Sequence, residues 1–521
     1  MTDSAPITIG YNGAFASFTI SPLRVRARGG VTRWIYSSLF RFDQDGELVG
    51  DLVDRWAVSP DRQTYLLTLK SGVKWHDGSP LRAADVVFTA ERLQEGGRAF
   101  RNTLMAHGEP ARFSALGDHT VRIDLAGPQA NFLSYLTPVW GALFLVVPEH
   151  AVTAAGEDGF EANPIGSGPF KWGGLPDGDT LRLVANDDYF GGAPRAPHID
   201  VRFFAHNDER VDAFQRGDLD VLIFPGRKYT AEDAEQAGAR LYSTPTNTIV
   251  QMAMNCRHPL FSSVRIRQAI AAAIDRPRLV ADIEGIDGIA AYSPVGPVSW
   301  AFSDDVAQHP YDPERARELL SLEGWLPGED GVLTKAGERF SFAIMFPPDT
   351  WNYELGRWAA GIARYLEAVG IHAQPRAVDY WTTLKTAWRE QSFEAFIYYD
   401  TFYVEPDFYW AFHSSMPRRP ETPEAPSRLP QYGYGVSGYA NARVDSLIEE
   451  YRAESDPALR RALVVRIQQI LAEEVASLWL YNHQWKNAVR NEIQGLSRPG
   501  VSDGTSDLVV LLHPERLFKP I

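Results

Sequence analysis

Short stretches of alternating apolar and polar residues recur along the chain, and segments with a helical apolar stripe lie between many of them. Alternation with a period of two predicts half-buried strands, whereas apolar residues spaced three and four apart predict amphipathic helices. The expected strands are ITIGY, TVRIDLA, ALFLVV, TLRLVA, IDVRFF, DVLIF, TIVQMAMN, FSFAIMF and EAFIYY. Because helices lie between many of these strands, the sequence predicts an α/β fold with mixed sheets.

Two of the expected helices carry clear signals at their ends. Residues 312–325 begin with an aspartate cap and a proline at the first helical position, and they stop at Gly324. Residues 353–369 end at Gly370. The apolar stripes predict that both helices face a core, through Ala316, Leu319 and Leu320 in the first and Leu355, Trp358, Ala359, Ile362 and Leu366 in the second.

The segment KSGVKWHDGSPLRAADVVFTAERL, residues 70–93, combines a turn with the start of a helix. The Asp-Gly pair supplies a position that tolerates positive φ, and Trp75 is expected to pack beneath this turn. His76 lies beside an aspartate but has no second His, Cys or Ser at a recognised catalytic or metal-binding spacing. We therefore expect a structural segment whose helix turns four apolar residues inward, Ala84, Val87, Phe88 and Leu93.

Length, charge and cysteine content narrow the class of protein. The chain has 521 residues, enough for two or three domains, and its net charge of −15 argues against nucleic acid or an anionic membrane as a partner. A single cysteine, Cys256, excludes an intramolecular disulfide and a multi-cysteine metal site. It ends an apolar strand, so we expect a partly buried structural thiol.

The start of the chain and the search for known short motifs mainly exclude classes of protein. No run approaches the roughly 18 apolar residues of a membrane span, and the start MTDSAPITIGYNG lacks a basic region followed by an apolar one. This start indicates either a mature form with an added Met or a chain that stays in the cytoplasm. The phosphate-loop, zinc-protease and dinucleotide motifs are absent, and GVSDG (residues 500–504) is followed by a strand instead of the helix that a nucleophile elbow requires. We expect no cofactor and no metal.

Aromatic residues are abundant, with 14 Trp, 21 Tyr and 27 Phe, and they crowd in FIYYDTFYVEPDFYWAF, residues 396–412. Such a block is typical either of a core or of a wet pocket in which flat rings hold a ligand and polar tips orient it. The strand is expected to end near Tyr399, with three acids beyond it, Asp400, Glu405 and Asp407. The pocket interpretation is favoured for residues after Tyr398, and the core interpretation stays open.

Several ordered segments together resemble a known family. VKWHDGSPLRAADVVFT is similar to the signature segment of the family 5 extracellular solute-binding proteins, the peptide and nickel binding group that serves ABC importers. The resemblance continues through WIYSSLFRFDQDGELVGDLVDRW, NPIGSGPFKW, NDDYFGGAPRAPHIDVRFF, FQRGDLDVL, NCRHPLFSSVRIRQAIAAAIDRPRLV, YDPERARELLSLEGW and GYANARVDSLIEEYRAESDPALRRALVVRIQQILAEEVASLWLY. It spans nearly the whole chain.

The resemblance implies a two-lobed periplasmic-binding-protein fold of the cluster C type, which closes on a ligand and catalyses no reaction. The implied lobe I core comprises residues 1–30, 166–245 and 482–521, with an extra subdomain at 31–165. Lobe II comprises residues 246–481. Binding is expected to shift the population toward a closed state, because contacts from both lobes form only there.

The resemblance also implies where the ligand lies and shows a departure from the family pattern. The expected ligand-binding residues are Tyr11, Asn12, Trp381, Tyr399, Asp400, Phe402, Tyr403 and Arg418. Peptide-binding members hold the peptide ammonium with an aspartate four residues before a proline, and counting back from Pro406 places Phe402 there. A phenyl ring cannot pair with an ammonium, so sugars and opine-like conjugates become candidates beside oligopeptides, unless a gap of two residues moves Asp400 into the place.

Two classes of function therefore stay open, and an enzyme ranks third. The favoured one is a monomeric periplasmic protein that delivers a small polar solute to ABC permease subunits. This requires a signal peptide that has been removed. The alternative is a cytoplasmic ligand sensor or regulator that uses the same fold.

Overall fold

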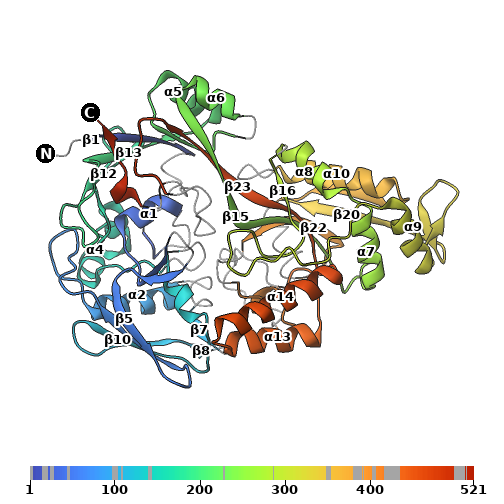
Figure 1. Cartoon of the computed structure of the whole chain (residues 1–521), viewed down its shortest axis with the longest axis horizontal. Helices are drawn as coiled ribbons and strands as arrows, with labels where there is room; N and C mark the ends of the chain where they lie inside the picture. Colours follow the sequence, from blue (N-terminus) through green and yellow to red (C-terminus); the bar gives the residue numbers. More distant parts are fainter. Residues whose placement is uncertain are drawn as a thin grey trace. The chain divides into compact units, whose positions relative to one another are not determined.

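The computed structural model of the chain forms two compact units. It describes residues 4–13, 21–23, 29–43, 47–96, 104–106, 109–138, 144–226, 229–285, 287–347, 354–379, 390, 392–401, 406–415, 435–497, 511 and 513–520. Unit 1 comprises Met1–Thr244 and Gln484–Ile521, and unit 2 comprises Pro245–His483. The chain passes between the units twice, inside the long strands β15 (Ala239–Met254) and β23 (Leu478–Arg490) (Figure 1).

The main sheet of unit 1 runs in the order β11-β12-β13-β2-β14 and continues into the end of β23. Three neighbouring strands at its centre are parallel: β13 (His198–Phe204), β2 (Ile7–Asn12) and β14 (Val221–Ile223). Antiparallel β12 (Thr180–Ala185) and β11 (Phe170–Trp172) extend one edge. Buried and half-buried residues alternate along β13, which is the pattern of a strand with one core-facing side.

The rest of unit 1 consists of helices and smaller sheets. The helices among its described residues are α1 (Gly29–Ile35), α2 (Ala83–Gly96), η2 (Phe132–Leu136), α4 (Glu149–Ala162), α5 (Asn207–Arg216), α6 (Ala231–Gln236) and η5 (Pro514–Arg516). A four-stranded antiparallel sheet has the order β5-β6-β10-β9, with bounds Val53–Val58, Thr64–Leu69, Thr120–Asp124 and Arg112–Ala115. Three strand pairs complete the unit: β1 (Ser4–Ala5) with β24 (Lys519–Pro520), β3 (Phe40–Phe42) with β4 (Leu48–Gly50), and β7 (Met105–Ala106) with β8 (Glu109–Pro110).

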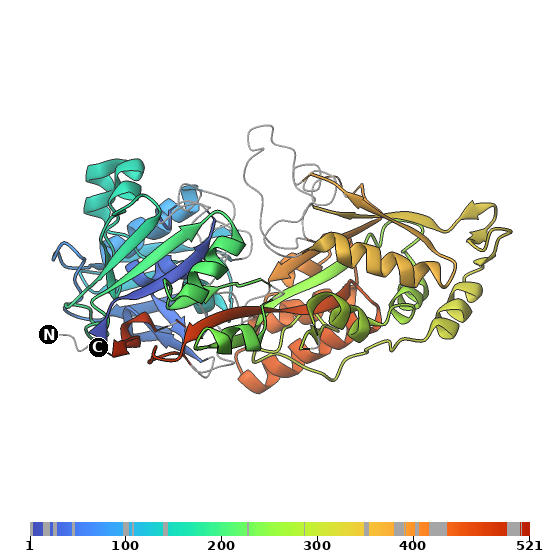
Figure 2. The ribbon, with the colours of Figure 1, turned by 90° about the horizontal axis from the view of Figure 1, so that it is seen from above.

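Unit 2 is built on β15-β22-β20-β21, in which β22 (Ala395–Thr401) pairs antiparallel with β15 and parallel with β20 (Ser341–Phe346). Helices α7 (Val264–Ala272), α8 (Arg276–Glu284), α9 (Pro313–Leu322) and α10 (Leu355–Glu367) share one apolar cluster with the sheet, and α10 runs along it in Figure 2. A second cluster contains residues of α12 (Tyr409–Phe412), α13 (Ala442–Ala453) and α14 (Pro457–Glu473). Strand β21 comprises His372–Ala377, and the shorter strands include β16 (Ile289–Ala290), β17 (Leu326–Pro327), β18 (Leu333–Lys335) and β19 (Glu338–Arg339).

Most of the expected elements are confirmed, and α9 and α10 show why. Asp312 accepts a hydrogen bond from the N–H of Arg315 at 2.8 Å, and Gly324 and Gly370 adopt φ of 85° and 83° after the helices. The expected strand ALFLVV is not confirmed for its described part, residues 144–147. There the structure has an isolated bridge between Ser38 and Leu145. This run is apolar because it is buried, and burial alone does not require ladder pairing.

The turn at residues 70–93 is confirmed, but the apolar side of its helix is different from the prediction. Gly78 has φ of 88°, and the side chain of Trp75 is buried. Ala84 is exposed and Val87 and Phe88 are half-buried, whereas the buried residues of α2 are Ala83, Asp85, Val86, Thr89, Ala90 and Leu93. Apolar residues occur on more than one side of this helix, so its periodicity allowed two stripes, and packing selected the one that includes Ala83.

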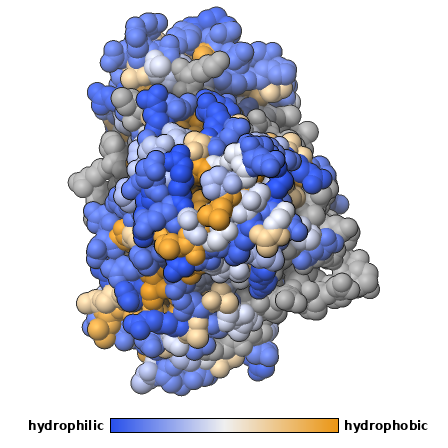
Figure 3. Space-filling model, turned by 90° about the vertical axis from the view of Figure 1, so that its right-hand side faces the viewer, coloured by the Kyte–Doolittle hydropathy of each residue, from blue (hydrophilic) through white to orange (hydrophobic). Residues whose placement is uncertain are grey.

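Figure 3 shows a face of unit 2 on which hydrophilic and hydrophobic residues are interspersed. Unit 2 exposes several large apolar side chains, including Leu322 at the end of α9 and Leu326 in β17. Single apolar residues of this kind are normal on a protein surface. We therefore assign no docking role to this face.

Candidate functional site

His76 serves the scaffold of unit 1. Its backbone N–H donates to the carbonyl of Gly166 at 2.8 Å, and the N–H of Gly166 donates to its Nδ1 at 3.1 Å. Its Nε2 lies 3.1 Å from the carbonyl oxygen of Gly168, to which it donates. The neutral imidazole ring of His76 therefore holds the loop at residues 163–169. Burial lowers the pKa of His76 to about 4, which favours this neutral form.

This pKa gives the stability of the protein a pH dependence that a variant can remove. The pKa of His76 in the folded protein lies below its ordinary value of 6.5. The contribution of His76 to the free energy of unfolding is therefore complete above pH 6.5 and is lost as the pH falls toward 4. The shift corresponds to about 3 kcal/mol at most. We expect His76→Gln to flatten the decrease in unfolding free energy between pH 7 and pH 4.5, as measured with urea.

Solute affinity is expected to be unchanged in His76→Gln and in Cys256→Ser. Cys256 lies beyond the end of β15, where its Sγ contacts the carbonyl of Met254 at 3.5 Å, and burial raises the pKa of its thiol. Both side chains therefore contact backbone groups of the scaffold. A loss of affinity measured by calorimetry in either correctly folded variant would show that the assignment to the scaffold is wrong.

In unit 2, a polar strip lies along one face of the β15–β22 pair. The register places Ile249 opposite Asp400 and Gln251 opposite Tyr398, and residues directly opposite each other share a face. Asn247 lies two residues before Ile249 on the same face. The strip therefore consists of Asn247, Gln251, Tyr398 and Asp400, which are between 0% and 7% exposed.

Asn247 and Gln251 have polar atoms without a hydrogen-bond partner among the described residues. These atoms are the carboxamide nitrogen and oxygen of Asn247 and the side-chain oxygen of Gln251. Gly296 lies so close that a β-carbon there would be 2.9 Å from Oδ1 of Asn247. An unsatisfied buried polar atom costs about 1–3 kcal/mol, so a polar ligand or water that reached these atoms would be bound favourably.

Asp400 and Tyr398 complete the strip with different chemistry. The N–H of Thr401 donates to Oδ1 of Asp400 at 2.9 Å. Burial, with a smaller effect of Asp400, raises the pKa of Tyr398 well above that of a free tyrosine. Tyr398 is therefore a neutral hydroxyl near neutral pH, and the strip combines a carboxylate, a hydroxyl and two carboxamides.

The structure separates Tyr399 from Asp400. Tyr399 lies opposite Val250, on the other face of the pair, and packs against the apolar cluster of α7 to α10. This follows from a strand that runs to Thr401, two residues beyond its expected end. Four expected ligand-binding residues lie outside the described residues: Trp381, Phe402, Tyr403 and Arg418.

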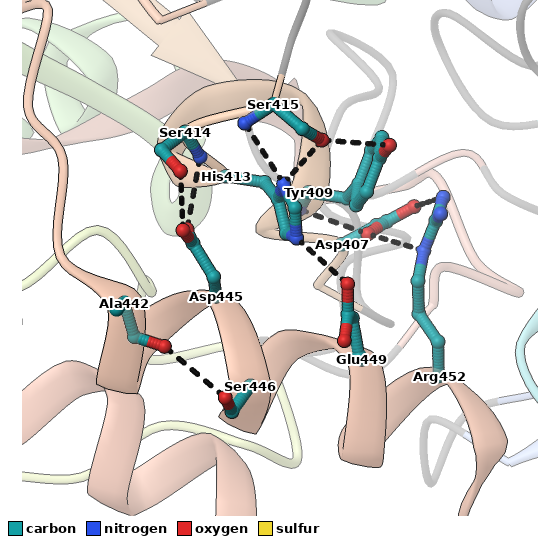
Figure 4. Close-up of polar contacts among 10 residues, drawn as sticks. All are labelled: Asp407, Tyr409, His413, Ser414, Ser415, Ala442, Asp445, Ser446, Glu449 and Arg452. Carbon is teal, nitrogen blue, oxygen red and sulfur yellow. Dashed lines mark hydrogen bonds and ion pairs between the residues drawn. The ribbon is translucent and has the colours of Figure 1, made fainter.

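One face of α13 holds Asp407 in the aromatic block and the turn that follows the block (Figure 4). Asp445, Glu449 and Arg452 are spaced by four and three residues, which places them on the same side of the helix. Arg452 forms a bidentate ion pair with Asp407, with distances of 2.8 and 3.2 Å. Asp407, which we expected near a wet pocket, is thus a buried anchor.

The other two contacts of α13 fix the turn at residues 413–415. The backbone N–H of Ser414 donates to Asp445 at 2.9 Å, and Nε2 of His413 lies 3.2 Å from Glu449 (Figure 4). The Nδ1 of His413 receives both the N–H and the hydroxyl of Ser415, at 3.2 and 2.7 Å. Ser415 therefore has the contacts of a turn residue.

In unit 1, Tyr11 and Asn12 end β2, the central strand of the parallel trio. Tyr11 is half-buried, with its ring centroid 5.6 Å from that of Phe203, and Asn12 is exposed. The carboxyl ends of parallel strands are a common place for ligands in α/β proteins. Sequence reasoning missed Arg210 of α5, whose buried side chain reaches this edge.

Metal sites and membrane-spanning helices have no support in the described part of the chain. Within the described ranges, no group of three or more His, Cys, Asp and Glu side chains is placed to hold a metal ion. No helix among these residues has the length and apolar character needed to cross a membrane. A surface groove of about 620 Å³ lies in unit 2 between residues 305–307 and helices α13 and α14, and it includes none of the expected ligand-binding residues.

Comparisons with known proteins identify the family. The description "Bacterial extracellular solute-binding proteins, family 5 Middle" matches residues 47–417. The oligopeptide-binding protein AppA of Bacillus subtilis is 26% identical over 481 residues, which cover 89% of this chain and 84% of the relative.

Two solved structures share the fold. The B. subtilis AppA structure, in complex with a nonapeptide, superposes with a TM-score of 0.74 at 24% identity and full coverage of both chains. The binding protein AgaA of A. tumefaciens R10, in complex with agropinic acid, gives a TM-score of 0.73 at 20% identity and 98% coverage of both. These similarities confirm the expected α/β, two-lobed periplasmic-binding-protein fold. The chain belongs to the family 5 bacterial extracellular solute-binding proteins, the substrate-binding components of ABC importers.

Proposed function

We propose that the protein captures one small polar solute between two closing lobes and delivers it to the permease subunits of an ABC importer. Family membership supports the role in import. The polar strip supports the polar character of the solute, because the buried carboxamide of Asn247 has no partner in the described structure. Capture of this kind requires no chemical step.

The proposed solute is an oligopeptide or a sugar or opine-like conjugate. Asp400 offers a charge-assisted acceptor for an amine or hydroxyl, while Asn247 and Gln251 offer amide groups for further polar atoms. Phe402, at the place of the usual ammonium-binding aspartate, argues for the conjugates over free peptide termini. The two solved structures that share the fold hold a nonapeptide and agropinic acid, so the fold accommodates either kind of solute.

The proposed lobes follow the boundaries given by the resemblance: residues 1–30, 166–245 and 482–521 for lobe I, 31–165 for its extra subdomain, and 246–481 for lobe II. Closure by a solute requires that it binds the closed form more tightly than the open one. The proposed protein acts as a monomer in the periplasm and needs neither nucleic acid nor a cofactor.

Native mass spectrometry of the protein as purified, followed by calorimetry, tests this function. We expect a mass increment of one small solute, and one-to-one binding when that solute or a member of a peptide, sugar and opine panel is added back. The absence of any bound solute together with no binding across the panel would contradict the proposal. Tight binding of peptides regardless of their sequence would contradict the preference for conjugates.

A cytoplasmic ligand sensor or regulator is the second candidate, because it would use the same fold and the same polar strip. The two are distinguished by the genomic start site. An upstream start that encodes a basic region followed by an apolar one supports import. If no such start exists and the protein is recovered from the cytoplasm, the sensor is supported.

A further inference from the structure

Three arginine side chains are almost completely buried in the described structure. Arg210 of α5 is 0% exposed, Arg267 of α7 is 3% exposed and Arg276 of α8 is 4% exposed. A buried guanidinium is expensive unless its N–H groups are hydrogen-bonded, since desolvation opposes the charge. The partners of each arginine therefore indicate what it is for.

Arg267 and Arg276 have structural partners. All three nitrogens of Arg267 donate to backbone carbonyls, among them those of Glu474 and Phe261 at 2.8 Å. Both terminal nitrogens of Arg276 donate to carbonyls, including that of Trp479 at 3.3 Å. These two side chains tie together segments that are distant in the sequence.

Arg210 is only partly satisfied. Its Nη2 donates to Oδ1 of Asn207 at 2.6 Å and to the carbonyl of Phe224. Its Nε and Nη1 have no hydrogen-bond partner in the described part of the chain. Burial lowers the pKa of Arg210 to about 10, so the group stays charged at neutral pH. One N–H on Nε and two on Nη1 are left for an acceptor.

The guanidinium of Arg210 lies near the carboxyl ends of the parallel strands, where its Nη2 contacts Asn207 and Phe224. Its stem crosses β2 at Gly10, where a β-carbon would be 3.1 Å from its Cγ. Asn207 begins α5, directly after β13, and Phe224 follows β14. Strand alternation places Asn12 on the same side of β2 as Gly10, one step nearer the carboxyl end, and Asn12 is exposed.

We infer that Arg210 and Asn12 form a subsite for an anionic oxygen group of the solute, such as a carboxylate. Asn12 is the exposed donor at the entrance, and the guanidinium behind it supplies the positive charge. This inference rests on the proposed function and narrows it, because it selects peptides with a free carboxyl terminus and acidic conjugates over neutral sugars.

Matched charged and neutral probes test the subsite. The probes are tripeptide pools with free or amidated carboxyl termini, and mannopinic acid with its methyl esters, measured by calorimetry at neutral pH. We expect the wild type to bind the charged member of at least one pair about tenfold or more tightly. Arg210→Met is expected to reduce this preference to about threefold or less, and Arg210→Lys is expected to retain part of it.

Two further variants keep the test decisive. Arg276→Met removes an equally buried guanidinium with carbonyl partners, so it is expected to lower the melting temperature while keeping the preference for charged probes. Asn12→Ala changes an exposed residue and is expected to reduce the preference even if Arg210→Met does not fold.

The outcomes separate the subsite from the proposed function. If the wild type binds solutes without a preference for charge, or if both Arg210→Met and Asn12→Ala keep that preference, the subsite is wrong and solute binding stands. If the wild type binds no probe and no solute copurifies with it, both are wrong.

Discussion

Replacing Arg452 by methionine is expected to lower the free energy of unfolding by about 3–5 kcal/mol, because it removes one partner of a buried ion pair. The side chain of Asp407 is 2% exposed and that of Arg452 is 12% exposed. Without the guanidinium, the carboxylate of Asp407 loses both charge-assisted hydrogen bonds and keeps the N–H of Tyr409, at 3.1 Å, as a donor. A buried charge without its counter-ion is the source of the expected loss.

Urea unfolding of wild type and variants measures this effect. Arg315→Met is the matched control, since it removes an ion pair with Glu318 whose side chains are 50% and 60% exposed. Exposed pairs contribute about 0.2–1 kcal/mol. The double variant Arg452→Met with Asp407→Leu is expected to recover most of the lost stability, because no unpaired charge remains. A loss below that of the Arg315 control would mean that α13 does not anchor the segment through this pair.

Replacing Asp400 by alanine is expected to weaken solute binding by about one to two decades, which corresponds to a charge-assisted hydrogen bond of roughly 1.5–3 kcal/mol. Asp400 is the acid of the polar strip and is 4% exposed. A buried carboxylate is screened less by water than an exposed one, so its bond to an amine or hydroxyl of the solute is strong.

Asp400→Asn and Asp275→Asn complete this measurement. Asp400→Asn keeps the shape of the side chain and one acceptor oxygen. If the solute donates a hydroxyl, this variant is expected to lose less affinity than Asp400→Ala. If the solute donates a charged amine, both variants are expected to lose about the same affinity. Asp275 is an acid of the same unit that caps α8 through the N–H of Arg278, at 3.0 Å. Its asparagine variant is expected to bind normally. Unchanged affinity in Asp400→Ala would remove this residue from the site.

Local signals explain which parts of the fold were predictable. The start of α9 depends on a cap and a proline, and a glycine follows both α9 and α10, so the sequence specifies these boundaries directly. The end of β22 depends on a distant partner. Thr401 lies opposite Thr248 and their hydroxyls are 2.8 Å apart, a contact that extends the strand past Tyr399. The extension places Tyr399 and Asp400 on opposite faces.

The remaining features of the candidate site depend on contacts between distant segments. Asp407 and Arg452 are 45 residues apart, and the backbone partner of Arg210 after β14 lies 14 residues from it. Asn247 gave no signal because an asparagine in a strand is ordinary until its burial and missing partners are known. Phe402 was noticed only because the family pattern has an aspartate there.

Small-angle scattering of the protein with and without its solute tests the central claim most directly. The solute is the one found by native mass spectrometry, and calorimetry first establishes one-to-one binding. We predict that the radius of gyration decreases at saturation, because contacts from both lobes favour the closed state. An unchanged radius of gyration with saturating, calorimetrically proven binding would contradict capture by closing lobes.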